Sequence, residues 1–82
     1  MAYEDSFKKV VEILSPFARN KEALDNVNGD SRIIDDLQVN SSRLVDIVLA
    51  MEDEFDIEIE DEEVEKVTTV GSAVELIEGK TG

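Results

Sequence analysis

The most constraining feature of this 82-residue chain is the stretch from Asn40 to Phe55. A polar Asn-Ser-Ser step precedes an unbroken apolar segment, and an acidic turn follows it. The apolar residues recur at the spacing that gathers side chains on one face of a helix. Asn40 or Ser41 can cap the start, because a short side-chain oxygen accepts from free backbone N–H groups. We therefore expect a helix over 41–55 and place function at its start, on a serine hydroxyl.

Three further helices are predicted on both sides of this one. Pro16 ends the first of them, because proline lacks an N–H and clashes with the preceding turn. Thr68 or Thr69 caps the last helix, and Gly79 ends it. The predicted segments are a frayed tail at 1–5, helices at about 6–15, 61–66 and 69–79, a mostly irregular loop at 18–40 with a possible helical turn at 21–27, and an extended linker at 56–60.

These segments predict an all-α fold in one domain spanning residues 1–82. The domain has three main helices, one short helix between the last two, and a long first loop. A hydrophobic fraction of 41% supports a modest core but not a deep catalytic cleft. The predicted core consists of Phe7, Val11, Leu14, Ile34, Leu37, Leu44, Ile47, Val48, Met51, Phe55, Ile59, Val67, Val74 and Ile77.

The charge of the chain excludes several classes of partner. Its net charge of −13 at pH 7 repels nucleic acid and anionic membrane surfaces. No apolar run is long enough to span a bilayer, so we expect no stable membrane insertion. The absence of cysteine excludes disulfides and thiolate metal sites and fits a cytoplasmic location. We expect a monomer that is steered toward basic surfaces on its partners.

The residue types that are missing argue against an enzyme. The chain has no His, Cys or Trp, so the usual bases and thiol nucleophiles are absent. Carboxylates perform acid–base catalysis only in a pocket that shifts a pKa, and a chain this short rarely builds one. We therefore predict no catalytic residues.

At residues 36–70 the sequence resembles the acyl carrier proteins. The similarity lies in Asp36-Leu37-Gln38-Val39-Asn40-Ser41, in Glu52-Asp53-Glu54-Phe55-Asp56, and in the segment from Asp61 to Val70 that ends Thr68-Thr69-Val70. The family pattern is Asp-Leu-Gly-x-Asp-Ser-Leu at the start of a helix that ends Glu-Glu-Glu-Phe. The resemblance covers Ile33 to about Ile77 without a gap, and it implies an acyl-carrier-like four-helix bundle.

The resemblance also implies a covalent 4'-phosphopantetheine arm on a serine. Counting back from the Glu-Asp-Glu-Phe-Asp anchor identifies this serine as Ser41, with Ser42 as the rival. The free N–H groups and positive dipole of a helix start favour a phosphodiester there. The alternative is that Ser41 only caps the helix, since serine is among the commonest capping residues.

The chain departs from the family pattern around this serine. Asn40, Ser42 and Arg43 stand where the family has Asp, Leu and an acidic residue. The family's acidic residues help to engage the basic transferase that installs the arm, so two readings follow. The chain is a specialised carrier with its own partners, or it is an unmodified, degenerate copy that acts as an acidic adaptor. Arg43 could also pair with the phosphate of the arm.

Ten of the fourteen residues from Glu52 to Glu65 are acidic, which suggests three interpretations. The cluster is a solvated surface, a weak divalent-ion site without the spacing of a calcium loop, or a docking surface for basic patches on partner enzymes. The resemblance favours docking, and we predict no dedicated metal site. The predicted docking residues are Asp36, Asn40, Arg43, Val45, Asp46, Leu49, Glu52 and Asp53.

The resemblance further implies a cavity for the thioester-linked chain. The candidate lining residues are Leu44, Val48, Met51, Ile59 and Val67, although this apolar face could equally be core. The implied function is to hold acyl intermediates for fatty-acid, polyketide or other specialised lipid synthesis, together with a phosphopantetheinyl transferase and synthase or acyltransferase partners. An aminoacyl or D-alanyl carrier and the unmodified adaptor are the alternatives.

Overall fold

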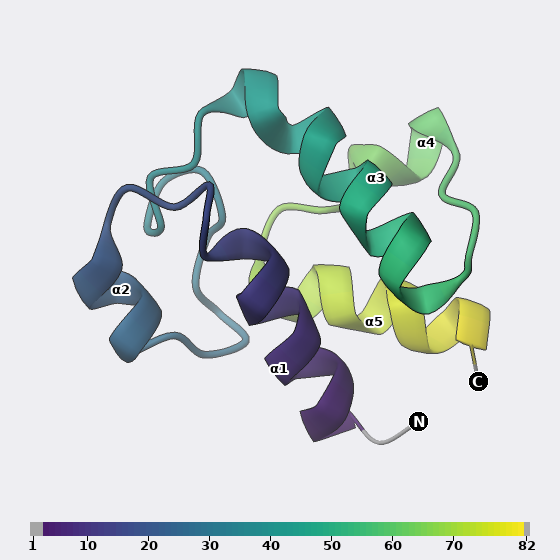
Figure 1. Ribbon diagram of the computed structural model, residues 1–82, viewed down its shortest axis with the longest axis horizontal. Coiled ribbons are helices and arrows are strands. Elements are labelled where there is room, and N and C mark those ends of the chain that lie inside the picture. The colour runs from purple at the N-terminus through teal and green to yellow at the C-terminus, as the bar shows by residue number, and fades with distance from the viewer. Residues whose placement is uncertain (1–2, 82) are drawn as a thin grey trace.

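The computed structural model describes residues 3–81, and within that range the regular structure is helical, with no strand. The elements are α1 (Tyr3–Leu14), α2 (Lys21–Asp25), the 3₁₀ turn η1 (Ser41–Arg43), α3 (Leu44–Phe55), α4 (Asp61–Val64) and α5 (Val70–Thr81). The all-α fold class is therefore confirmed. Figure 1 shows α1, α3 and α5 packed together, α4 beside α3, and α2 set apart within the long first loop.

Three short contacts join α1 to the other main helices. Buried Ser6 donates its hydroxyl to Glu78 Oε1 on α5 at 3.1 Å. Lys9 pairs with Glu54 at 3.8 Å and lies over the ring of Phe55, 5.8 Å from its centroid. Because α1 contacts both α5 and α3, it fixes the angle at which α3 presents its exposed face.

The first helix begins earlier than the sequence analysis predicted. Tyr3 to Asp5, predicted to be a frayed tail, form the first turn of α1; residues 1–2 of that tail lie outside the described residues. The rings of Tyr3 and Phe7 stack with centroids 6.4 Å apart, one helical turn from each other. Glu4 and Asp5 add negative charge at the positive end of the helix dipole. These two interactions explain the early start.

The other boundaries differ from the prediction by a few residues. Residues 41–43 form a 3₁₀ turn, so the α-helical part of the main helix begins at Leu44. The short helix α4 ends at Val64 rather than at residue 66. The last helix does not stop at Gly79 but continues to Thr81, whose hydroxyl donates to the carbonyl of Ile77. Thr69 caps it by accepting from the backbone N–H of Ser72 at 3.0 Å.

Of the fourteen residues predicted to form the core, all but four are buried. Ile34, predicted to be buried, is 40% exposed, whereas its neighbour Ile33 is fully buried. Phe7, Val11 and Leu44 are only half-buried at the edge of the core. Buried hydrophobic residues that the prediction did not include are Val10, Ala18, Ile33, Val39, Val70 and Ala73.

The long loop is held to the start of α5 by a short ladder of backbone bonds. Ile33 N–H donates to Thr68 O at 3.1 Å, Val70 N–H to Ser31 O at 2.9 Å, and Gly71 N–H to Gly29 O at 2.9 Å. A Cβ added to Gly71 would lie 2.7 Å from that Gly29 oxygen, so this close approach requires glycine. The ladder fixes the loop that leads to the start of α3.

Candidate functional site

The serine pair lies at the start of α3, where Val39 anchors the end of the long loop. Val39 is buried, and its N–H donates to the carbonyl of Ile33 at 3.2 Å. The preceding Gln38 adopts a left-handed conformation with φ of 56°, which turns the chain toward the surface. The next four residues, Asn40 to Arg43, are all exposed. We call residues 40–43 the α3 mouth.

Asn40, rather than Ser41, caps the α3 mouth. Its Oδ1 accepts from the backbone N–H of Ser42 at 3.0 Å and from the Ser42 hydroxyl at 2.9 Å. Asparagine therefore performs the capping role without adding a negative charge. Of the two alternatives that the sequence left open, the structure selects Asn40.

The two serines consequently differ in their hydroxyl groups. The Ser42 hydroxyl is engaged with Asn40, whereas no hydrogen bond within residues 3–81 involves the Ser41 hydroxyl. The Ser41 side chain is exposed at the first residue of η1. Its oxygen is open to a reaction partner without first breaking an internal bond. Capping therefore does not account for Ser41.

Arg43 is paired with a neighbour on α3. Its Nη1 lies 3.1 Å from Asp46 Oδ2, and the two side chains are 63% and 47% exposed. At this exposure the pair contributes little stability, about 0–1 kcal/mol. In this arrangement the guanidinium is directed along α3, and the predicted contact with an arm phosphate is not preformed.

Two apolar residues of α3 face solvent. Val45 is 60% exposed and Leu49, one turn later, is 54% exposed. Residues four apart lie on the same face of a helix, so they form one apolar patch. Asp46 and Asp53 are exposed on the same helix. We call Val45, Asp46, Leu49 and Asp53 the docking face.

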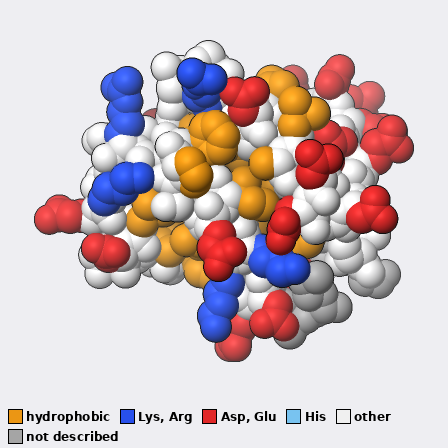
Figure 2. Space-filling view, viewed as in Figure 1, with side chains coloured by type: hydrophobic (Ala, Val, Ile, Leu, Met, Phe, Trp, Pro, Cys, Tyr) orange, Lys and Arg blue, Asp and Glu red, His pale blue; other side chains and the backbone are white. Residues whose placement is uncertain are grey.

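Two other predicted docking residues have structural bonds. Glu52 is half-buried, and its Oε2 accepts from the N–H of Ile59 at 2.8 Å, which ties the linker to α3. Asp36 Oδ2 accepts from the N–H of Arg32 at 2.8 Å within the loop. Figure 2 shows acidic side chains gathered over the end of the molecule that holds α4 and the end of α3.

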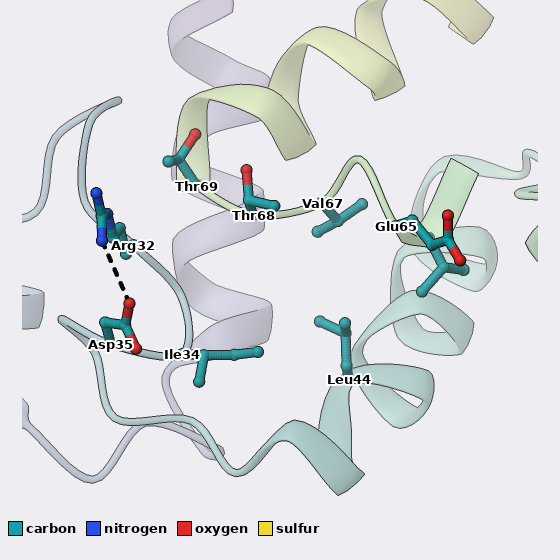
Figure 3. Close-up of a pocket in the computed structure, with 9 residues that line it drawn as sticks. Arg32, Ile34, Asp35, Leu44, Glu65, Val67, Thr68 and Thr69 are labelled. Carbon is teal, nitrogen blue, oxygen red and sulfur yellow. Dashed lines mark hydrogen bonds and ion pairs between the residues drawn. The ribbon is translucent and has the colours of Figure 1, made fainter. Parts of the chain in front are cut away.

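A groove of about 600 Å³ opens between the long loop, the start of α3 and the α4–α5 connection. Figure 3 shows the side chains of Ile34, Leu44 and Val67 converging on it, with the Arg32–Asp35 ion pair at one edge. Its lining residues are Arg32, Ile34, Asp35, Leu44, Val64, Glu65, Val67, Thr68 and Thr69.

The groove contains two of the five predicted cavity residues, Leu44 and Val67. The other three, Val48, Met51 and Ile59, are buried in the core and do not line it. The sequence analysis missed Ile34 and Val64 as lining residues. Both are apolar residues next to a polar segment. This sequence pattern does not distinguish a side chain buried in the core from one that lines a groove.

One ion pair holds the α4 side of the groove to α5. Lys80 Nζ lies 2.8 Å from Glu63 Oε1, next to the lining residue Val64. Glu63 also accepts from the N–H of Glu60 in a capping box. The hydrogen bond from Lys80, assisted by that from the Glu60 backbone, lowers the pKa of the Glu63 carboxyl below its usual 4.5. The pair therefore stays charged well below neutral pH.

The acidic side chains of residues 3–81 form no group of three placed to hold a metal ion. None of the helices described is long and apolar enough to cross a membrane.

Comparison with known proteins gives consistent results. The family model for the phosphopantetheine attachment site matches residues 8–77. An acyl carrier protein from Picosynechococcus is 50% identical over 58 residues, covering 71% of this chain and 72% of its own. One from Petrotoga mobilis is 42% identical over 80 residues, covering 98% and 92%. A solved acyl carrier protein structure from Enterococcus faecalis superimposes with a TM-score of 0.79 at 39% identity, covering 98% and 99%.

Proposed function

The chain belongs to the acyl carrier protein family, and on that premise we propose that Ser41 carries its 4'-phosphopantetheine arm. Members of this family carry the arm covalently and are carriers rather than catalysts. In our proposal, residues 1–82 form a single carrier domain. The thiol of the arm holds acyl intermediates as thioesters, and partner enzymes perform the chemistry.

The observation that carries this proposal is the difference between the two serine hydroxyls. Ser41 is exposed and its hydroxyl has no hydrogen-bond partner among residues 3–81, whereas the Ser42 hydroxyl is bonded to Asn40 at 2.9 Å. A phosphodiester on Ser41 would also lie at the positive end of the helix dipole, where negative charge is favoured. Neither serine is hidden from a modifying enzyme.

The groove supports an acyl cargo. Ile34, Leu44, Val64 and Val67 supply its apolar lining, and Leu44 lies three residues after Ser41. We propose that this lining shelters the first carbons of the acyl chain. Val48, Met51 and Ile59 lie in the core, so a longer chain would displace Leu44 to reach them. Methionine suits such a wall because its side chain is flexible.

The docking face supports recruitment of partner enzymes. Val45 and Leu49 form an apolar centre, with Asp46 and Asp53 as carboxylates on the same helix. Apolar anchors surrounded by charges are typical of transient interfaces, in which charge steers the encounter. We propose that basic patches of synthases, acyltransferases and the phosphopantetheinyl transferase bind here. The tether then raises the effective concentration of the substrate at each active site.

We propose that the chain serves lipid synthesis of the fatty-acid or polyketide type. We further propose that it acts as a monomer in the cytoplasm. The net charge of −13 supports the monomer, because copies of the chain repel one another.

Intact-mass measurement tests the proposal directly. The wild type, Ser41→Ala and Ser42→Ala are each co-expressed with the phosphopantetheinyl transferase of the source organism. We expect the wild type and Ser42→Ala to gain the mass of one arm and Ser41→Ala to gain none. Ser42→Ala keeps the Asn40 cap on the backbone N–H, so it is a matched control. A wild type that gains no mass would identify the chain as an unmodified adaptor.

A further inference from the structure

A pocket smaller than the groove lies beside the α3 mouth. It measures about 370 Å³ and is lined by Pro16, Phe17, Arg19, Asn40 and Arg43. The loop after α1 contributes the first three residues and the α3 mouth the other two. The sequence analysis did not identify Arg19 as part of any site, because the contact joins positions more than twenty residues apart.

This pocket is basic in a strongly acidic chain. It contains two guanidinium groups and no carboxylate, although the chain carries a net charge of −13. Arg19 is exposed and takes part in no ion pair within residues 3–81. Arg43 has a single carboxylate partner, Asp46, which does not line the pocket. The site therefore presents incompletely neutralised positive charge to solvent.

The geometry of η1 places this charge beside Ser41 rather than on it. Asn40 and Arg43, on either side of the serine pair, both line the pocket, whereas Ser41 does not. An enzyme that brings a reacting group to the Ser41 hydroxyl must therefore cover the adjoining surface, including the pocket.

We propose that this basic pocket is a contact site for the transferase that installs the arm, which places acidic side chains against Arg19 and Arg43. The inference rests on the proposed function. Synthases act on the far end of the flexible arm, whereas the transferase must bring its reacting group to Ser41 itself. Arginine pairs with carboxylates in a fixed, bidentate geometry, so the pocket selects partners by charge as well as by shape. Pro16 and Phe17 provide an apolar floor for the stems of those acidic side chains.

Steady-state kinetics of arm transfer test this inference. The substrates are the apo forms of the wild type, Arg43→Glu and Arg19→Glu, with the purified transferase of the source organism. Lys8→Glu is the matched control: Lys8 is also an exposed cation, but it lies on α1 and lines neither this pocket nor the groove. It changes the net charge by the same amount. Arg43→Lys tests whether charge alone suffices.

We expect KM for the carrier to rise roughly tenfold in Arg43→Glu and less in Arg19→Glu, with kcat nearly unchanged, because like charges then face each other across the interface. Lys8→Glu should stay within about twofold of the wild type, and Arg43→Lys should lie between the wild type and Arg43→Glu. Equal KM values for Arg43→Glu and Lys8→Glu, or a lower KM for Arg43→Glu, would overturn the inference while arm attachment still stands. A wild type that accepts no arm would overturn both.

Discussion

The two ends of α3 differ in charge and in what their polar side chains do. At the α3 mouth, Asn40 to Arg43 include no acidic residue, and the Ser41 hydroxyl is not bonded to any other residue that the structure describes. At the other end, Glu52, Asp53 and Glu54 occupy the last turn, which has no basic residue. The helix dipole favours the opposite distribution, with anions at the start and cations at the end. The helix dipole therefore explains Asp46 in the first turn but not the acidic last turn of α3.

The N-terminal end of α3 therefore carries the candidate reactive serine, whereas the C-terminal end is bound to neighbouring segments. Two of the acidic side chains at the C-terminal end make specific bonds. Glu52 accepts a hydrogen bond from the backbone N–H of Ile59, and Glu54 pairs with Lys9 of α1. Asp56 ends the helix in a left-handed conformation with φ of 53°. At the start of α3, the acidic side chain of the first turn is Asp46, and it is paired with Arg43. A phosphodiester on Ser41 would add negative charge at this favourable end of the helix dipole.

The largest effect that we predict from this comparison is on the docking face between the two ends. Leu49→Asp should lower kcat/KM for arm transfer about tenfold, because it removes an apolar anchor worth more than 1 kcal/mol at an interface. Tyr3→Asp is the control, since Tyr3 is also exposed, at 46%, but lies on α1. Steady-state kinetics measure the effect, and thermal melting checks that both variants stay folded. Equal losses in the two variants would exclude the docking face.

The next prediction concerns the C-terminal end of α3. Glu52→Ala should lower the free energy of unfolding by about 1–3 kcal/mol, because it leaves the N–H of Ile59 without its charged partner. Asp53→Ala removes the same charge from an exposed neighbour and should stay within about 0.5 kcal/mol of the wild type. Urea unfolding of both variants isolates the hydrogen bond. If the two variants lost the same stability, Glu52 would be only a surface charge.

The smallest effect should appear in the ion pair that joins α4 to α5. Lys80 lowers the pKa of Glu63 in the folded state. A depressed folded-state pKa adds stability above the unfolded-state pKa, and this stability is lost as the pH falls through the folded-state pKa. Glu63→Gln should therefore melt slightly below the wild type near neutral pH, and the gap should close below pH 4.5. Glu62→Gln is the exposed control, and a gap independent of pH would contradict the assignment.

Local patterns predicted much of this molecule. The apolar spacing indicated the extent of the main helix, and the Thr68-Thr69 step indicated where α5 starts. Val45 and Leu49, which the sequence analysis listed as docking residues, are exposed. Features that depend on contacts between distant residues were not predictable. Ile33 is buried in place of Ile34 because the loop pairs with the start of α5, at the bridge between Arg32 and Thr69.

The candidate site was likewise predictable only in part. The resemblance identified Ser41 by its distance from the Glu-Asp-Glu-Phe-Asp anchor, which depends on sequence alone. The 3₁₀ turn at 41–43 depends on the Asn40 side chain reaching two residues ahead, and the sequence left that capping role open. The structural bonds of Glu52 and Asp36 and the position of Arg19 beside Arg43 required the folded chain.

The central claim is that Ser41 is the residue that carries the arm. The most direct test is fragmentation mass spectrometry of the protein purified from its own cells, because it locates the added group on a single residue. We expect phosphopantetheine on Ser41, with an acyl group on part of the sample. An arm located on Ser42, or a chain that carries no arm, would contradict the account.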